Sequence, residues 1–192
     1  AVMINLEDGV APEFKPMARA MAALFISNIK ERKSKIIVRV NPLDEGGIDD
    51  IKVINQVKPD AIRVAKIRSI SEAKQAVALI DPEIEIHFSI ETASAFKLLT
   101  DLRVDERVTT FYLGILDLLA DMKLPQNIVA LGNATFETIL AQFLLGSHIA
   151  QVTPVGFTYQ AYKNLLTYEA YTKLQQKMGY TAFSCISPGQ VK

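Results

Sequence analysis

Residues 85–93 of the chain are Glu85-Ile86-His87-Phe88-Ser89-Ile90-Glu91-Thr92-Ala93. Its residues first alternate and then turn apolar, which predicts a buried strand. The strand is followed by an acid, Glu91, and then at once by a helical pattern. In α/β enzymes this order presents a catalytic group at the carboxyl edge of a parallel sheet. The stretch therefore predicts an α/β enzyme with Glu91 at its active edge.

The same pattern recurs along the chain. Seven strand-like segments lie near residues 1, 35, 61, 84, 108, 150 and 180. The first five end in the charged residues Glu7, Arg39, Lys66, Glu91 and Asp117, which are separated by 25 to 32 positions. That is the length of one strand-plus-helix unit, so the spacing predicts a parallel sheet, either a closed barrel or an open doubly wound one. Polar groups at the same end of five successive strands favour the barrel, whose active face is a ring.

A TIM (β/α)₈ barrel needs eight strands, and the sequence yields seven. The chain also begins inside a strand-like segment and has no initiator methionine. We therefore expect residues 1–192 to form a single TIM-barrel domain whose first strand–helix unit is missing.

Helical patterns lie between the predicted strands. The first, with Pro12 near its start, has Met17, Met21 and Leu24 as its core-facing positions. Ser69 and Glu72 predict a capping box at the start of a later helix. The remaining helix features are Asn133 as an N-cap, the apolar stripe Phe136, Ile139, Leu140, Phe143 and Leu144, and Gly179 as a C-terminal cap.

Composition limits the class of protein. With 49% hydrophobic and 22% charged residues, the chain is typical of a globular protein. Its formal net charge is zero and it has no long basic run, which argues against nucleic-acid binding. No apolar run reaches transmembrane length and no signal peptide is found, so we expect a soluble, cytoplasmic protein with no membrane partner. The single cysteine, Cys185, lies in an apolar run and is expected in the core.

Six segments carry short motifs, in order along the chain. They are Leu6–Pro12, Val38–Pro42, Ala65–Lys66, Ile90–Ala93, Leu113–Asp121 and Ile186–Gln190. Together they resemble the HpcH/HpaI aldolase and citrate lyase β-subunit family, nearer its citrate lyase β-like branch. The family motifs are Leu-Glu-Asp-Ser-Val-Pro-Pro, Val-Arg-Val-Asn, Pro-Lys, Ile-Glu-Thr, Phe-Gly-x-x-Asp-Leu-x-x-Asp and Ile-His-Pro-x-Gln.

The resemblance implies a TIM barrel that binds Mg²⁺ through Glu91 and Asp117, with Arg39 contacting the substrate. Members of the family cleave or form carbon–carbon bonds next to a carbonyl, on acyl-CoA thioesters or on free 2-oxo acids. The resemblance also implies a homo-oligomer, a trimer or larger.

The chemistry of these side chains suits that reaction class, which passes through an enolate. Mg²⁺ prefers one or two carboxylates and acts as a Lewis acid, while Arg39 offers a planar fork to a substrate carboxylate. Glu7 and Asp8 are the further catalytic candidates, because they can orient water or help to move a proton. Lys66 is a candidate for substrate binding, and the simpler alternative is an ion pair within the ring of charges.

Two functions remain open. The first is a Mg²⁺-dependent carbon–carbon lyase or aldolase that acts through a metal-stabilised enolate. The second is a member that has lost turnover and serves as a binding or assembly subunit. The second is permitted by departures from the family motifs: Ser187 stands for a histidine, Leu113 for an aromatic residue, and Asn133–Phe136 for an Ala-Arg-Ser element.

Overall fold

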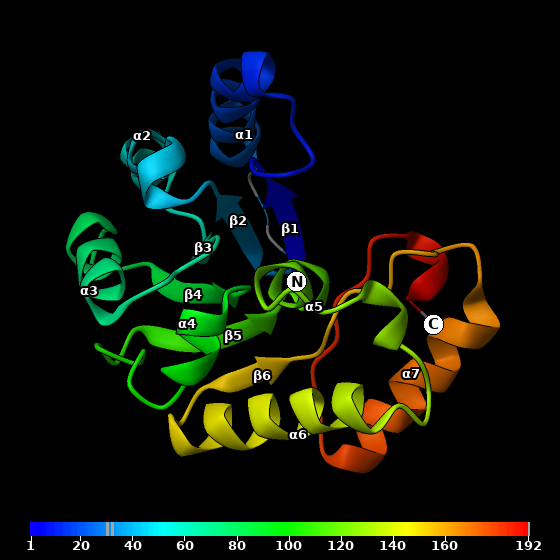
Figure 1. The fold of residues 1–192 in the computed structure, drawn as a ribbon. Helices are drawn as coiled ribbons and strands as arrows, with labels where there is room; N and C mark the ends of the chain where they lie inside the picture. Colours follow the sequence, from blue (N-terminus) through cyan, green and yellow to red (C-terminus); the bar gives the residue numbers. More distant parts are fainter. Residues whose placement is uncertain (30, 32, 192) are drawn as a thin grey trace. The chain divides into compact units, whose positions relative to one another are not determined.

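The computed structural model describes residues 1–29, 31 and 33–191, whose helices and strands are shown in Figure 1. The described strands are β1 (Val2–Asn5), β2 (Ile36–Val40), β3 (Ala61–Val64), β4 (Glu85–Ile90), β5 (Val108–Leu113) and β6 (Thr153–Val155). The described α-helices are α1 (Lys15–Asn28), α2 (Gly47–Ile54), α3 (Ile70–Leu79), α4 (Ala93–Lys97), α5 (Ile115–Asp121), α6 (Ala134–Ile149) and α7 (Leu165–Met178). The described strand pairs are parallel, which confirms the predicted α/β class.

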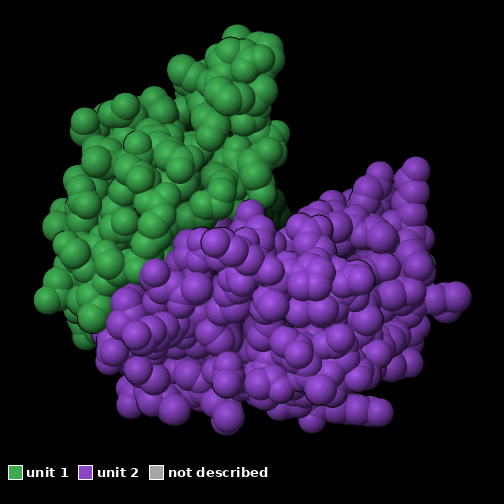
Figure 2. Space-filling model, viewed as in Figure 1, with its two compact units in different colours: residues 1–89, 104–109 green, residues 90–103, 110–192 purple. Residues whose placement is uncertain are grey.

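The chain divides into two compact units, which Figure 2 colours separately. Unit 1 comprises residues 1–89 and 104–109, and unit 2 comprises residues 90–103 and 110–192. The division separates the candidate site residues by chemistry. Unit 1 holds Glu7, Asp8, Arg39 and Lys66, whereas unit 2 holds Glu91 and Asp117.

The sheet of unit 1 runs β1-β2-β3-β4, in the order of the chain. Its apolar residues are buried on both faces, as parallel strands require: the pair Val38 and Ile62 on one face and the pair Ile37 and Ala61 on the other are each at most 5% exposed. The register pairs Asn5 with Arg39, Arg39 with Arg63 and Arg63 with His87. Because paired residues of neighbouring strands share a face, these four form one polar row across the sheet.

Local capping fixes the start of α3. The Ser69 hydroxyl accepts a hydrogen bond from the backbone N–H of Glu72 at 3.1 Å, as predicted. The carboxylate of Glu72 turns back to the backbone N–H of Arg68 at 2.7 Å, one residue before the position that a capping box uses. The helix therefore begins where the sequence predicts, with a shifted return bond.

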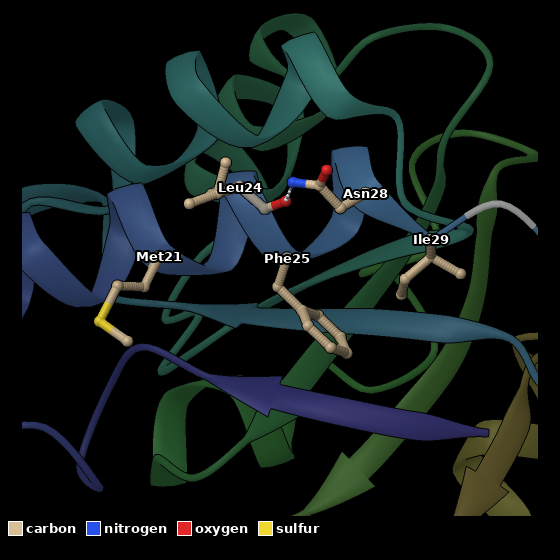
Figure 3. Close-up of a pocket in the computed structure, with 5 residues that line it drawn as sticks. All are labelled: Met21, Leu24, Phe25, Asn28 and Ile29. Carbon is tan, nitrogen blue, oxygen red and sulfur yellow. Dashed lines mark hydrogen bonds between the residues drawn. The ribbon is translucent and has the colours of Figure 1, made fainter.

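Helix α1 contradicts the predicted core face. Met17, Met21 and Leu24 are 60%, 62% and 65% exposed, and the buried residues of α1 are Ala22 and Ile26. Met21 and Leu24 help to line a shallow pocket with Phe25, Asn28 and Ile29, shown in Figure 3. The helix is apolar on more than one face, so its periodicity could not identify the side that meets the sheet.

Unit 2 contains two long helices, α6 and α7, whose ends agree with the sequence prediction. Helix α6 has the predicted Asn133 cap, whose side chain accepts from the N–H of Phe136 at 3.1 Å, and its predicted apolar stripe is buried. Helix α7 ends at Gly179, whose φ of +112° is the left-handed conformation expected of a C-terminal glycine.

The predicted strand near residue 180 is absent from this described segment. Ala182 makes one isolated bridge to Val155 of β6, and the N–H of Gly156 donates to the carbonyl of Ala182 at 3.0 Å. Cys185 is exposed, so its predicted core position is wrong. This part of the chain has β-forming residues, but only Tyr180 among residues 180–186 is buried. Burial, and not propensity alone, decides whether a strand forms.

Candidate active site

Two acids hold the guanidinium of Arg39 at the carboxyl ends of β1 and β2. Arg39 Nη2 lies 2.8 Å from Glu7 Oε2, and Arg39 Nη1 lies 3.0 Å from Asp8 Oδ1. Arg39 and Glu7 are buried, whereas the side chain of Asp8 is 58% exposed. The structure therefore brings together three of the predicted site residues as one charge-assisted network.

The turn between residues 5 and 9 fixes both acids. Asn5 Nδ2 donates to Asp8 Oδ1 at 2.7 Å, and Asn5 Oδ1 accepts from the N–H of Glu7 at 3.0 Å. Burial alone would raise the pKa of Asp8, but the hydrogen bond from Asn5 and the charge of Arg39 outweigh it and lower the pKa below its usual 3.8. Asp8 is therefore ionised at neutral pH.

Lys66 joins this network from the end of β3. Its Nζ lies 3.4 Å from Glu7 Oε1, which confirms the ion pair predicted as the simpler alternative. Its φ is +49°, a left-handed conformation that a residue with a Cβ adopts at a cost. Backbone strain of this kind is often found at functional sites. Substrate binding by Lys66 remains a prediction.

Asp50 of α2 is a fully buried carboxylate that contacts Asn41, two residues after Arg39 in the chain. Asp50 Oδ2 accepts from the backbone N–H of Asn41 at 3.0 Å and from Asn41 Nδ2 at 2.6 Å, while Oδ1 takes Arg19 Nε at 2.7 Å. Asn41 Nδ2 also donates to the carbonyl of Leu6 at 3.0 Å, and Asn41 Oδ1 accepts from Lys15 Nζ. These contacts tie the strand ends that carry Glu7 and Arg39 to α1 and α2.

Close backbone approach makes this arrangement possible. A Cβ at Gly47 would lie 2.2 Å from the carbonyl oxygen of Asn41, so only glycine fits at the start of α2. The sequence analysis missed Asp50, because an acid in the first turn of a helix is usually an exposed partner of the helix dipole.

Glu91 and Asp117 lie in unit 2, at the carboxyl ends of β4 and β5. The N–H of Gly114 donates to the carbonyl of Ile90 at 3.1 Å, which joins the two strand ends. Glu91 is buried against Gly114: a Cβ at position 114 would lie 2.2 Å from Glu91 Cγ and 2.8 Å from Oε1. Asp117 follows three residues later, exposed in the first turn of α5.

Asp121 links the segments that carry these two acids. Its Oδ2 accepts from the backbone N–H of Ala93 at 2.8 Å, at the start of α4. Ala93 lies two residues after Glu91, and Asp121 lies one helical turn after Asp117. This bond therefore restrains α5 relative to the Glu91 turn.

The donor set in unit 2 fits Mg²⁺. Glu91 and Asp117 supply hard carboxylate oxygens, one buried and one exposed, and Mg²⁺ commonly uses only one or two protein carboxylates with water and substrate oxygens. The absence of a side chain at Gly114 leaves room for the Glu91 side chain itself, whose Cγ would lie 2.2 Å from a Cβ at this position. Among residues 1–29, 31 and 33–191, no group of three or more His, Cys, Asp or Glu side chains could hold a metal. A magnesium site here would therefore depend on ligands from solvent and substrate.

Arg63 is a buried charge that the sequence analysis did not single out. It lies in β3 beside Arg39 in the strand register, and its Nε donates to Ser89 Oγ at 2.7 Å. His87 is buried next to it in β4, with Nε2 3.5 Å from Glu85 Oε2. Burial lowers the pKa of His87 to about 4 against the raising effect of Glu85, so the ring is neutral at pH 7.

Two departures from the family motifs have structural roles. The hydroxyl of Ser187 accepts from the N–H of Gly189 at 3.3 Å, and Gln190 Oε1 accepts from the N–H groups of Ile186 and Ser187. Asn133 caps α6, as described above. Neither of these departures from the family motifs falls on one of the candidate acids, Glu91 and Asp117.

Within the described residues, no helix is long and apolar enough to cross a membrane.

Comparison with known proteins places these motifs in one family. The sequence profile of HpcH/HpaI aldolase/citrate lyase matches residues 1–188. The (3S)-malyl-CoA thioesterase of Cereibacter sphaeroides (strain ATCC 17025 / ATH 2.4.3) is 28% identical over 195 residues, which cover 100% of this chain and 66% of the relative. The chain thus spans about two thirds of the length of the curated relatives that it matches.

Solved structures share the fold. A citrate lyase from Burkholderia xenovorans LB400 has a TM-score of 0.88 at 18% identity, over 97% of this chain and 65% of that one. Protein CitE from Mycobacterium tuberculosis, in complex with magnesium, acetoacetate and coenzyme A, has a TM-score of 0.84 at 18% identity, over 100% of this chain and 69% of that one. At these identities the likeness shows the fold alone, whereas the profile match shows the family. The chain belongs to the HpcH/HpaI aldolase/citrate lyase family.

Proposed function

We propose that the protein is a Mg²⁺-dependent carbon–carbon lyase or aldolase that acts through an enolate, on an acyl-CoA thioester or a 2-oxo acid. The observation that carries the proposal is the contact of Glu91 with Gly114, three residues before Asp117, at the ends of two parallel strands. These two acids would hold the ion. When bound, Mg²⁺ supplies Lewis-acid stabilisation for negative charge on a substrate carbonyl oxygen.

The other site residues have distinct roles in this proposal. Arg39 binds a substrate carboxylate through its guanidinium, a planar group that a lysine ammonium cannot replace. Glu7 holds Arg39 and Lys66 in position, since its two oxygens contact one cation each. Asp8 is the candidate proton carrier because it is ionised and exposed, and Lys66 is a further substrate contact.

The names of the curated relatives point to a CoA thioester, whereas solved citrate lyase β and CitE structures also contain the 2-oxo acids oxaloacetate and pyruvate. The curated relatives are (3S)-malyl-CoA thioesterases at 25–28% identity, and the CitE structure contains coenzyme A. Thioester hydrolysis is therefore the second candidate function. It would require water as the nucleophile at the same site.

We also propose that the strands belong to a TIM (β/α)₈ barrel, that residues 1–192 form part of one domain, and that the protein is a homo-oligomer. The spacing of the strand-end charges and the TM-scores with known family structures support the barrel. A crystal structure of the full-length protein, with its oligomeric state measured by light scattering, tests these three points together.

Proton exchange in D₂O tests the function without a second substrate. If the site acidifies the C–H next to a bound carbonyl, pyruvate or acetyl-CoA should lose methyl protons faster with protein and Mg²⁺ than in buffer. EDTA should stop the exchange, and Arg39→Lys should slow it. Proton NMR of the methyl signal measures the rate, and the probe that exchanges identifies the substrate class.

The same experiment separates the enzyme from a binding or assembly subunit. Demonstrated Mg²⁺ binding with no exchange of either probe would contradict the lyase. Release of coenzyme A from (3S)-malyl-CoA without exchange would favour thioester hydrolysis instead. Glu91 and Asp117 carboxylate oxygens more than about 7 Å apart in a crystal structure would exclude a shared ion, because each Mg–O bond is about 2.1 Å.

A further inference from the structure

The two acids on Arg39 differ in how firmly they are held. Glu7 is buried, and its Oε2 accepts from both Arg39 Nη2 and the backbone N–H of Asp8 at 2.8 Å. Its Oε1 also faces Lys66, so removing Glu7 would take an ion-pair contact from each of two cations. Asp8, by contrast, is mostly exposed and contacts one cation, Arg39 Nη1. Because Asp8 is the exposed partner of this pair, water can hydrate its carboxylate when the contact with Arg39 breaks, so Asp8 can leave at low cost.

The charge of the cluster determines what can enter. Arg39 and Lys66 are balanced by Glu7 and Asp8, two cations against two anions. A substrate carboxylate added to this set would lie beside Asp8 on the same guanidinium, and like charges at that distance repel. Exchange of one carboxylate for another keeps the cluster neutral and leaves no buried charge unpaired.

We propose that Asp8 is a displaceable internal ligand of Arg39, which leaves Nη1 when a substrate carboxylate binds there. This inference rests on the proposed function, in which Arg39 is the carboxylate-binding residue. Glu7 remains on Nη2 throughout and keeps the guanidinium in its plane. The released Asp8 carboxylate then stands next to the bound substrate, tethered by the turn that Asn5 stabilises. Substrate binding and release of the proton carrier are thereby one event.

Direct binding of pyruvate, measured by titration calorimetry in the presence of Mg²⁺, tests the exchange. Asp8→Ala removes the competitor and should lower the dissociation constant roughly 1.5- to fivefold, the range for losing an exposed charge partner. Asp8→Asn keeps an acceptor for Asn5 but loses the charge, and should give a smaller gain. Thermal unfolding followed by circular dichroism checks that each variant is folded.

A matched control lies in the same unit. Asp44 is 62% exposed and contacts Arg68 Nη1 at 2.8 Å, an ion pair similar to that of Asp8 but outside the candidate site. Asp44→Ala should leave pyruvate binding unchanged. Arg39→Met should abolish binding, and in that background Asp8→Ala should have no further effect.

The outcomes separate the inference from the function. Weaker or unchanged binding by Asp8→Ala, with binding lost in Arg39→Met, would overturn the displacement and leave the carboxylate-binding role of Arg39 intact. Absence of pyruvate binding in the wild type and in Asp8→Ala would contradict both, since Arg39 would not be an accessible carboxylate site. Equal gains from Asp8→Ala and Asp44→Ala would indicate a general charge effect and would also overturn it.

Discussion

The candidate residues of the two units differ in the charges that they carry. In unit 1, Glu7, Asp8, Arg39 and Lys66 are joined by ion pairs that balance charge within the cluster. In unit 2, the candidate residues Glu91 and Asp117 are both acidic and lie at neighbouring strand ends. The first arrangement is suited to exchanging one anion for another. The second is suited to recruiting a cation.

Because of this difference, each of the two groups of residues can use charge in its own way. Oppositely charged side chains at strand ends fix one another and pre-organise a binding group such as Arg39. Like-charged side chains repel, and a bound divalent ion relieves that repulsion. Each variant below changes either the acidic pair, Glu91 and Asp117, or the ion-paired cluster around Arg39.

The largest effect is expected at the acidic pair. Asp117→Asn should lower the rate of Mg²⁺-dependent methyl-proton exchange of the substrate about 100-fold or more. It removes a charged ligand from the ion that would stabilise the enolate. Wild-type protein should be stabilised by about 1.4 kcal/mol at tenfold excess of Mg²⁺ over its Kd, and this gain should vanish in the variant. Calorimetric titration and thermal unfolding measure both.

Backbone amide hydrogen exchange tests whether Mg²⁺ binds near Glu91 and Asp117 and not near Glu7 and Asp8. Mg²⁺ should increase protection around residues 90–121 and leave residues 5–9 unchanged. Asp101→Asn, an exposed acid of unit 2, is the control and should behave like the wild type. Protection that rises equally in both segments would mean that Mg²⁺ does not distinguish the two charge clusters.

Gly114→Ala should have the next largest effect. The added methyl would lie 2.2 Å from Glu91 Cγ, so either the carboxylate or the strand end must move. We expect a loss of about 1–3 kcal/mol of unfolding free energy, typical of overpacking, together with weaker Mg²⁺ binding. Gly189→Ala is the control, because its Cβ would meet only ordinary contacts at 3.7 Å and 3.9 Å. Urea unfolding measures the difference, and equal stability of the two variants would contradict the close approach.

Asp121 should act as a positioning residue for the acidic pair. Asp121→Ala removes the acceptor for the N–H of Ala93 and should weaken Mg²⁺ binding by roughly tenfold, the lower end of the range for outer contacts of metal sites. Asp121→Asn keeps an acceptor oxygen and should bind almost normally. Glu137→Ala breaks a similar bond, to the N–H of Gly132 at 3.0 Å, and should not change the titration. A loss of affinity in Glu137→Ala as large as in Asp121→Ala would refute this role.

The smallest effect is expected from Lys66→Gly, which measures the balanced cluster. Glycine relieves the left-handed backbone strain but loses the ion pair with Glu7. Lys123 has a φ of +57° and is exposed, so Lys123→Gly should stabilise the protein by about 0.5–1 kcal/mol. The gain from Lys66→Gly should be smaller by a few tenths of a kcal/mol, because its ion pair is partly solvated. A larger gain from Lys66→Gly than from Lys123→Gly, in urea unfolding, would mean that this ion pair adds nothing.

Much of the fold could be predicted because it depends on local patterns. Apolar runs that end in a charge identified β1 to β5, and the Asn133 and Gly179 caps identified the ends of α6 and α7. The acids Glu91 and Asp117 could be selected for the same reason, since each follows a buried strand. Where the local sequence pattern agrees with burial, a single amino-acid sequence is enough to predict the element.

The rest depends on contacts between distant residues. Asp50 supports Asn41 and Arg19 across 9 and 31 positions, which no local pattern reveals. Arg63 is a single charged residue within a short buried strand, and no local pattern indicates its contact with Ser89. The importance of Gly114 comes from the side chain of Glu91, which approaches it from a different strand.

The exposed stripe on α1 has a consequence for how the protein behaves in solution. Met17, Met21 and Leu24 present apolar surface, and the chain has no net charge at pH 7 to keep its copies apart. Weak attraction between molecules is then opposed by little long-range electrostatic repulsion. Added salt therefore has little repulsion to screen. We therefore expect the solubility of this chain to be lowest near neutral pH and to rise on either side, as the molecule acquires charge of one sign.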